Sequence, residues 1–186
     1  MKHHLKMTAA LALALLALPF GLWLTLSLMS ELKQNSLINA GPLRWQNVDG
    51  SWSSLQSSAA PYTLLFLGFL SCDSVCPKRL SEMALISRNT DAEQLQVLFI
   101  TIDATRDTAG IRRQLVDALG IRSGLLEPQA LRALRSRLHD RNQELSRHSP
   151  RTYLLARDGR VLAIFQGEAL SAHAVQKHLS MLNATT

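Results

Sequence analysis

Two predominantly apolar runs constrain the fold of this chain more than any other feature of its sequence. The first, YTLLFLGFL at residues 62–70, and the second, LQVLFITID at residues 95–103, each have the length of a strand. Neither run alternates apolar with polar residues, so both strands are expected to be covered on both faces. Between them, from Pro77 to about Arg88, apolar residues recur near helical spacing, and Pro77 suits the first position of a helix. The sequence therefore predicts two buried strands with a helix between them.

Weaker signals around this unit indicate further elements. GPLRWQNVDGSWSSLQ predicts two short strands around the turn Asp49-Gly50, and TYLLARDGRVLAIFQG predicts a second hairpin around Asp158-Gly159. Three more helices are predicted from apolar residues at helical spacing: Ile111, Leu115 and Leu119 with Gly120 as the stop; Leu131, Leu134 and Leu138; and Val175, Leu179 and Leu182. This order predicts an α/β fold, a central mixed sheet with helices on both faces, which suits a thioredoxin-like architecture.

The N-terminal region contains a long uncharged segment. Residues 7–29 carry no charged side chain and are long enough to cross a bilayer as one helix, in which Pro19 and Gly21 are tolerated. A buried core helix does not suit this length, and a cleaved signal peptide is the closer alternative. The run is long for a signal peptide, and SLMSELKQ after it shows no small-x-small cleavage pattern. We therefore expect an uncleaved transmembrane helix.

Charges beside this segment predict its orientation. Lys2 and Lys6 precede it, whereas the two charges just after it cancel, so the basic end is expected in the cytoplasm. The chain then divides into a membrane anchor at residues 1–33 and an exported domain at residues 34–186, which begins with a short polar linker. The expected location is a bacterial-type inner membrane, crossed once, with the domain on the periplasmic side.

Export also decides how the charge of the chain is interpreted. The formal net charge of +6 suits a nucleic-acid-binding protein, but an exported domain meets no nucleic acid. Arginines that gather in the second half of the chain are therefore interpreted as a solvated face or as a docking patch for an acidic partner. They are Arg132, Arg135, Arg137, Arg141, Arg147 and Arg151.

Both cysteines of the chain lie in one short motif, SCDSVCP, between the first predicted strand and its helix. Outside the cytoplasm a thiol pair is free to oxidise. The amides and dipole of the helix, together with Lys78 and Arg79, favour thiolates there. The spacing of Cys72 and Cys76 brings both sulfurs to one side of a helical turn, so they can close a disulfide or bind one metal ion. A purely structural disulfide is the alternative, although so short a loop gains little stability from one.

A metal site at this motif needs a further ligand, and an imidazole commonly joins thiolates on copper(I). Of the six histidines, two precede the membrane segment, two fall in the last predicted helix, and His139 closes another helix, whose carbonyls it can cap. His148 remains, in SRHSPRTYLL directly before the strand at residues 152–156. In a thioredoxin-like fold this loop lies beside the cysteine turn, which makes His148 the candidate third ligand; a solvated loop histidine is the alternative.

Three linked motifs resemble the Sco (SenC) family of membrane-anchored copper proteins. They are FLGFLSCDSVCPKRLSEM, VLFITIDATRDT and RHSPRTYLLARDGR, which follow one N-terminal anchor in this order and cover most of residues 62–160. The resemblance implies a copper chaperone or thiol reductase that helps assemble the dinuclear copper centre of cytochrome c oxidase. It also implies that Cys72, Cys76 and His148 are the copper ligands, and that Asp103 is a nearby acidic residue of unassigned role.

Two functions remain open at this point. In the first, the domain is a metallochaperone that delivers Cu(I) to the copper-bearing subunit of cytochrome c oxidase; Cu(II) can also bind to it. Another copper chaperone or a thiol reductase is then a further partner. In the second, it is a thiol-disulfide oxidoreductase whose catalytic pair, Cys72 and Cys76, keeps the acceptor cysteines reduced. A peroxide-reducing thiol enzyme is less favoured, because no feature singles out one peroxidatic cysteine.

Overall fold

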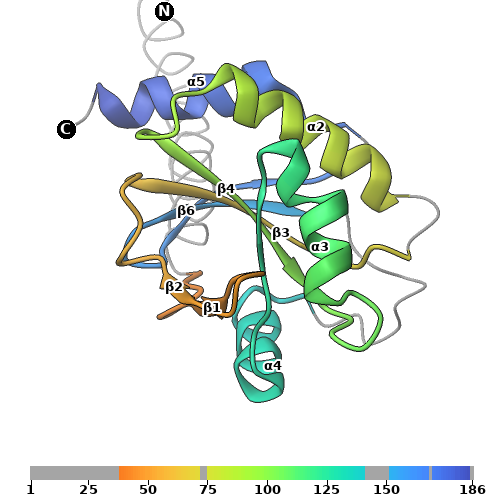
Figure 1. Cartoon of the computed structure of the whole chain (residues 1–186). Helices are drawn as coiled ribbons and strands as arrows, with labels where there is room; N and C mark the ends of the chain where they lie inside the picture. Colours follow the sequence, from red (N-terminus) through yellow and green to blue (C-terminus); the bar gives the residue numbers. More distant parts are fainter. Residues whose placement is uncertain (1–37, 72–74, 141–150, 168, 185–186) are drawn as a thin grey trace, which may run out of the picture. The chain divides into compact units, whose positions relative to one another are not determined.

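The computed structural model confirms the two predicted central strands. β3 (Tyr62–Gly68) and β4 (Leu95–Thr101) pair in parallel at the centre of a five-stranded sheet (Figure 1). β5 (Arg122–Gly124) lies beside β4 in parallel, whereas β6 (Thr152–Ala156) pairs with β3, and β7 (Val161–Phe165) with β6, in antiparallel register. The order across the sheet is β5-β4-β3-β6-β7, so the sheet is mixed, as predicted.

The structure describes residues 38–71, 75–140, 151–167 and 169–184. The predicted membrane segment at residues 7–29 lies outside these ranges, and so do Cys72 and His148. Among the described residues, no helix is both long and apolar enough to cross a membrane.

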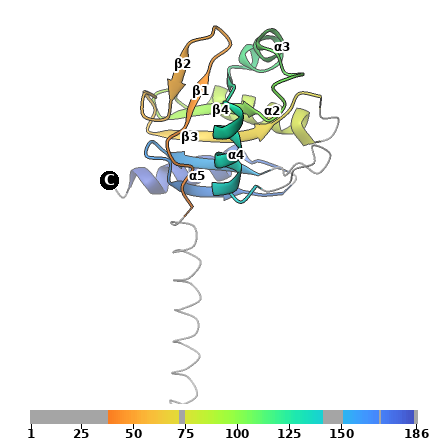
Figure 2. The same cartoon turned by 90° about the horizontal axis from the view of Figure 1, so that it is seen from below.

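Both faces of the sheet are covered, which agrees with the prediction. α2 (Val75–Asn89) and α5 (Ala172–Asn183) belong to the core on one face. α4 (Pro128–Arg137) belongs to the core on the other face, together with the small hairpin formed by β1 (Arg44–Gln46) and β2 (Trp52–Ser54) (Figure 2).

β3 contributes to both of these cores. Leu64 and Phe66 pack with α2, whereas Leu65 and Leu67 pack with the core beneath α4 and the hairpin. Successive side chains of a strand point to opposite faces, so a strand covered on both sides needs apolar residues at every position. The unbroken apolar run identified in the sequence has this cause.

The two predicted hairpins are confirmed. β1 pairs with β2 around Asp49-Gly50, and β6 pairs with β7 around Asp158-Gly159. Gly159 has a φ of 86°, and a Cβ there would lie 2.6 Å from the carbonyl oxygen of Gly41. Glycine is therefore required at this turn, both for its backbone conformation and for the close approach of the neighbouring chain.

The helix predicted to end at Gly120 is shorter than expected. α3 (Ala109–Leu115) is followed by a 3-10 turn, η1 (Asp117–Leu119), and Gly120 then ends the segment with a φ of 78°. The stop signal was therefore correct, but the predicted helix consists of two pieces.

The buried face of α3 also differs from the one that its apolar spacing indicated. Ile111 and Leu115 are exposed by 39% and 48%, whereas Arg112 and Val116 are buried. A pattern of only two turns carries little information on orientation, and tertiary contacts decided it here.

α2 begins two residues earlier than predicted, at Val75, so Pro77 is its third residue rather than its first. Proline is tolerated there because the N–H groups of the first turn have no acceptor within the helix. β5 was not predicted, because its sequence RSG has no apolar run. It forms by parallel pairing with Leu98–Ile100 of β4.

Candidate metal centre

The cysteine motif begins in the first connection at the carboxyl edge of the parallel strands and ends within α2. β3 ends at Gly68 and α2 begins at Val75, so this first connection comprises residues 69–74. Cys76 is the second residue of α2 and is buried, with 1% of its surface exposed. It therefore lies at the start of a helix, where the sequence analysis placed it. Cys72, the other predicted sulfur ligand, lies outside the described residues.

The first turn of α2 favours negative charge. It contains no acidic residue, and the positive end of a helix dipole stabilises negative charge close to it. Lys78 is exposed in this turn and adds a cation. The local sequence is thus suited to a sulfur that acts as a metal ligand or as a nucleophile.

Arg79 has a more specific role than the sequence analysis assigned to it. The side chain is buried, and its Nη1 donates to Glu82 Oε2 at 3.0 Å, while its Nη2 donates to the carbonyl oxygen of Gly167 at 2.8 Å. Burial lowers the pKa of Arg79, and the charge of Glu82 opposes that shift. Glu82 Oε2 also accepts the N–H of Leu170 at 3.0 Å. The guanidinium therefore fixes α2 to the segment that leads into α5.

The second connection, residues 102–108 between β4 and α3, lies next to the first because β3 and β4 are parallel neighbours. Asp103 forms a salt bridge with Arg106, whose guanidinium carbon lies 5.9 Å from the centre of the Phe69 ring. Phe69 follows β3 directly and belongs to the first connection. Asp103 is therefore linked to the first connection indirectly, through its salt bridge with Arg106 and the contact of Arg106 with the Phe69 ring.

Asp107 makes a direct contact between the two connections. Its carboxylate oxygens each accept the N–H of Leu70 at 3.1 Å, and Oδ2 also accepts the hydroxyl of Thr101 at 2.6 Å. The side chain is buried, with 2% exposed, and this burial raises its pKa against the opposing effect of both hydrogen bonds. In the sequence, Asp107 is visible only as part of the motif VLFITIDATRDT. An acidic residue directly before Thr108, the N-cap of α3, was the available signal.

The described histidines do not join Cys76. His139 is exposed beyond the end of α4, and His173 is exposed on α5. His178 contacts the carbonyl oxygen of Ala174 at 2.9 Å and packs edge-on against Phe165, as expected for a partly packed helix residue. Within the described ranges, no three His, Cys, Asp or Glu side chains gather around a common metal position. The ligand set predicted from the sequence thus remains a prediction.

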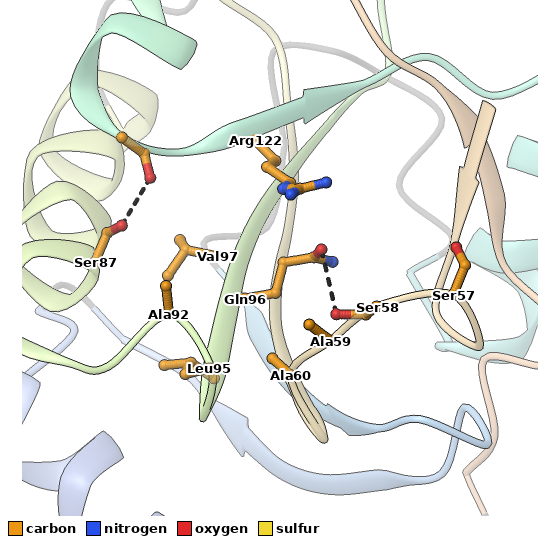
Figure 3. A pocket seen from close by; sticks show the side chains of 11 residues that line it. Ser57, Ser58, Ala59, Ala60, Ser87, Ala92, Leu95, Gln96, Val97 and Arg122 are labelled. Carbon is orange, nitrogen blue, oxygen red and sulfur yellow. Dashed lines mark hydrogen bonds between the residues drawn. The ribbon is translucent and has the colours of Figure 1, made fainter. Parts of the chain in front are cut away.

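A cavity of about 280 Å³ lies at the other end of the parallel strands, where β4 begins. Figure 3 shows Gln96 on its wall, where the Gln96 side chain accepts a hydrogen bond from the Ser58 hydroxyl. Arg122 extends across the same wall (Figure 3). The lining has no thiol, histidine or carboxylate. It therefore has none of the groups that the predicted chemistry requires.

Comparison with known sequences confirms the family that the three sequence motifs resemble. The sequence model of the SCO1/SenC family matches residues 34–183. A mitochondrial SCO2 homolog of Bos taurus is 31% identical over 139 residues, which is 64% of this chain and 52% of the bovine protein. The chain thus spans about half the length of this relative.

Comparison with solved structures defines the fold. Arabidopsis thaliana ScoI with copper bound gives a TM-score of 0.63 at 18% identity, over 79% of this chain and 99% of the other. The thioredoxin domain of a thiol-disulfide oxidoreductase from Bacteroides vulgatus gives 0.61 at 16% identity, over 77% and 97%. The domain has a thioredoxin-like fold, as the order of its elements predicted.

Proposed function

This chain belongs to the SCO1/SenC family, and we propose that it binds copper through Cys72, Cys76 and His148 and delivers Cu(I) to the dinuclear copper centre of cytochrome c oxidase during assembly. The observation that carries the proposal is the position of Cys76, which is buried at the start of α2, directly after the first connection. A Sco protein of the same fold has been solved with copper bound.

The chemistry of the donor set suits this cargo. Thiolates and an imidazole are soft or intermediate ligands that select Cu(I) over the harder divalent ions. The start of α2 favours the thiolate form that a metal requires. Copper held by so few ligands can pass to acceptor thiolates by stepwise exchange, in which each new sulfur bond replaces an old one.

We also propose that residues 7–29 remain in the mature protein as a transmembrane anchor, with the domain on the periplasmic side of a bacterial-type inner membrane. The acceptor would be the copper-bearing subunit of cytochrome c oxidase, with another copper chaperone or a thiol reductase as a further partner. N-terminal sequencing of the membrane-bound protein tests the anchor, since a mature chain that starts beyond Met29 would contradict it.

The test of copper binding uses the reduced full-length chain in detergent, titrated anaerobically with Cu(I) against a competing chelator. We expect one Cu(I) per chain. Cys72→Ser, Cys76→Ser and His148→Ala should each weaken retention by more than about tenfold, since loss of a group outside the ligand set alone can cost that much. His139→Ala, at an exposed histidine beyond α4, is the matched control and should bind like the wild type. A wild-type chain that takes up no Cu(I) rules out the proposal.

A second candidate function is thiol-disulfide exchange, favoured by the likeness to an oxidoreductase domain and by the cysteine at a helix start. A thiolate would attack a partner disulfide, and the other cysteine would resolve the mixed disulfide. His148→Ala separates the two functions. Oxidase assembly that survives this substitution but is lost with either cysteine identifies the reductase.

A further inference from the structure

We propose that Asp107 is a positioning residue for the cysteine pair: its carboxylate fixes the backbone of Leu70, two residues before Cys72, and so sets how tightly the pair holds copper. The inference deepens the proposed function and rests on it. It assigns a role to a residue outside the predicted ligand set, on a different connection of the chain from the cysteines.

The carboxylate of Asp107 accepts a hydrogen bond at the point where the backbone pairing between β3 and β4 ends. The N–H of Ile102 donates to the carbonyl oxygen of Gly68 at 2.8 Å, which continues the parallel ladder by one bond. The next donor of the first connection, the N–H of Leu70, instead donates to both oxygens of Asp107. A side chain thus replaces the neighbouring strand as the acceptor at this point.

Asp107 is itself held on several sides, so it acts as a rigid support. Thr101, the last residue of β4, is buried, and its hydroxyl donates to the same carboxylate. The N–H of Asp107 donates to the carbonyl oxygen of Asp103 at 3.0 Å, and α3 begins two residues later with Thr108 as its N-cap. An oxygen pair fixed in this way defines the position of the Leu70 backbone.

One residue, Ser71, separates Leu70 from Cys72 in the sequence, so the contact with Asp107 holds the chain two residues before the first predicted sulfur ligand. Two sulfurs that share one metal ion must each lie at about 2.3 Å from it, and small displacements of either backbone disturb that geometry. Outer-shell groups of this kind commonly change metal affinity by about tenfold to a hundredfold.

The alternative is that Asp107 supports folding alone. A matched control is Leu43→Ala, which removes a buried side chain from the core on the face opposite α2 and leaves both connections intact. A second variant, Thr101→Val, removes one donor to Asp107 but keeps the carboxylate. Asp107→Asn keeps an acceptor oxygen for Leu70, so it serves as the conservative rescue.

The experiment compares these variants as reduced full-length chains in detergent. Each is titrated with Cu(I) against a chelator, the reduction potential of its cysteine pair is measured in glutathione buffers, and its unfolding midpoint is recorded. We expect Asp107→Ala to weaken Cu(I) retention by about tenfold and to shift the potential, with Asp107→Asn and Thr101→Val intermediate. Leu43→Ala should lower the midpoint while it leaves affinity and potential unchanged.

The outcomes separate this inference from the proposed function. Wild-type copper binding with unchanged affinity and potential in the folded Asp107 variants overturns the inference and leaves the function standing. No copper binding by the wild type, with a potential that still shifts in Asp107→Ala, overturns the copper function but supports the positioning role. If Asp107→Ala does not fold, Asp107→Asn and Thr101→Val decide, and wild-type values in both count against the inference.

Discussion

The two connections at the carboxyl edge of β3 and β4 contribute different groups to the proposed site. The first, residues 69–74, carries Cys72, and Cys76 follows it within α2. The second, residues 102–108, has no thiol or imidazole, yet its carboxylates reach the first connection through Leu70 and, by way of Arg106, through Phe69. In the proposed site, the predicted sulfur ligands and the carboxylates that contact the first connection thus come from separate segments.

Each helix that follows one of the two connections contains a buried arginine, and the two arginines differ in their hydrogen bonds. Arg79 of α2 donates to Glu82 and to the carbonyl oxygen of Gly167. Arg112 of α3 is also buried, but within the described part of the chain both its Nε and its Nη1 have no hydrogen-bond partner, whereas in Arg79 only Nε has none. Burial lowers the pKa of Arg112, and Asp117 opposes the shift. We infer that the first arginine stabilises the fold and that the second costs stability.

The largest effect is expected at Arg79. Arg79→Met removes a buried guanidinium and leaves Glu82 without its ion-pair partner, so it should lower the free energy of unfolding by about 3 kcal/mol. Urea denaturation measures the loss. Lys78→Met, at the exposed neighbour, is the control and should change stability by less than about 0.5 kcal/mol. A loss at Arg79 as small as the control's would show that the contacts to Glu82 and Gly167 contribute little.

The comparison also explains what could be predicted from the sequence. The central strands were identified because covering on both faces demands continuous apolar residues, and Cys76 was placed correctly because a Cys-Pro step suits a helix start. The buried face of α3 was not predicted correctly, because whether an arginine such as Arg112 is buried depends on the residues that surround it in space. The contact between Leu70 and Asp107 joins residues 37 positions apart, and no local pattern encodes it.

A smaller effect of opposite sign is expected at Arg112. Arg112→Met replaces a buried cation, two of whose nitrogens have no hydrogen-bond partner among the described residues, with an apolar side chain of similar length, so it should raise the free energy of unfolding by about 1 kcal/mol. Arg113→Met is the control, because this neighbour is exposed and donates to the carbonyl oxygen of Val48 at the surface. The same urea experiment applies. A clear loss of stability in Arg112→Met would place this arginine in the same class as Arg79.

The smallest effect concerns the pH dependence contributed by Asp107. Burial raises the pKa of this carboxyl group in the folded state, so folding favours its protonated form. The stability that this preference contributes is fully present below the pKa of the unfolded chain and is lost as the pH rises through the higher folded pKa. Asp107→Asn cannot titrate, so the stability deficit of this variant relative to the wild type should be larger at about pH 3.5 than at about pH 7. Denaturation of both proteins at the two pH values measures the difference. A deficit that grows toward neutral pH would mean that the hydrogen bonds from Leu70 and Thr101 outweigh burial and keep the carboxylate ionised.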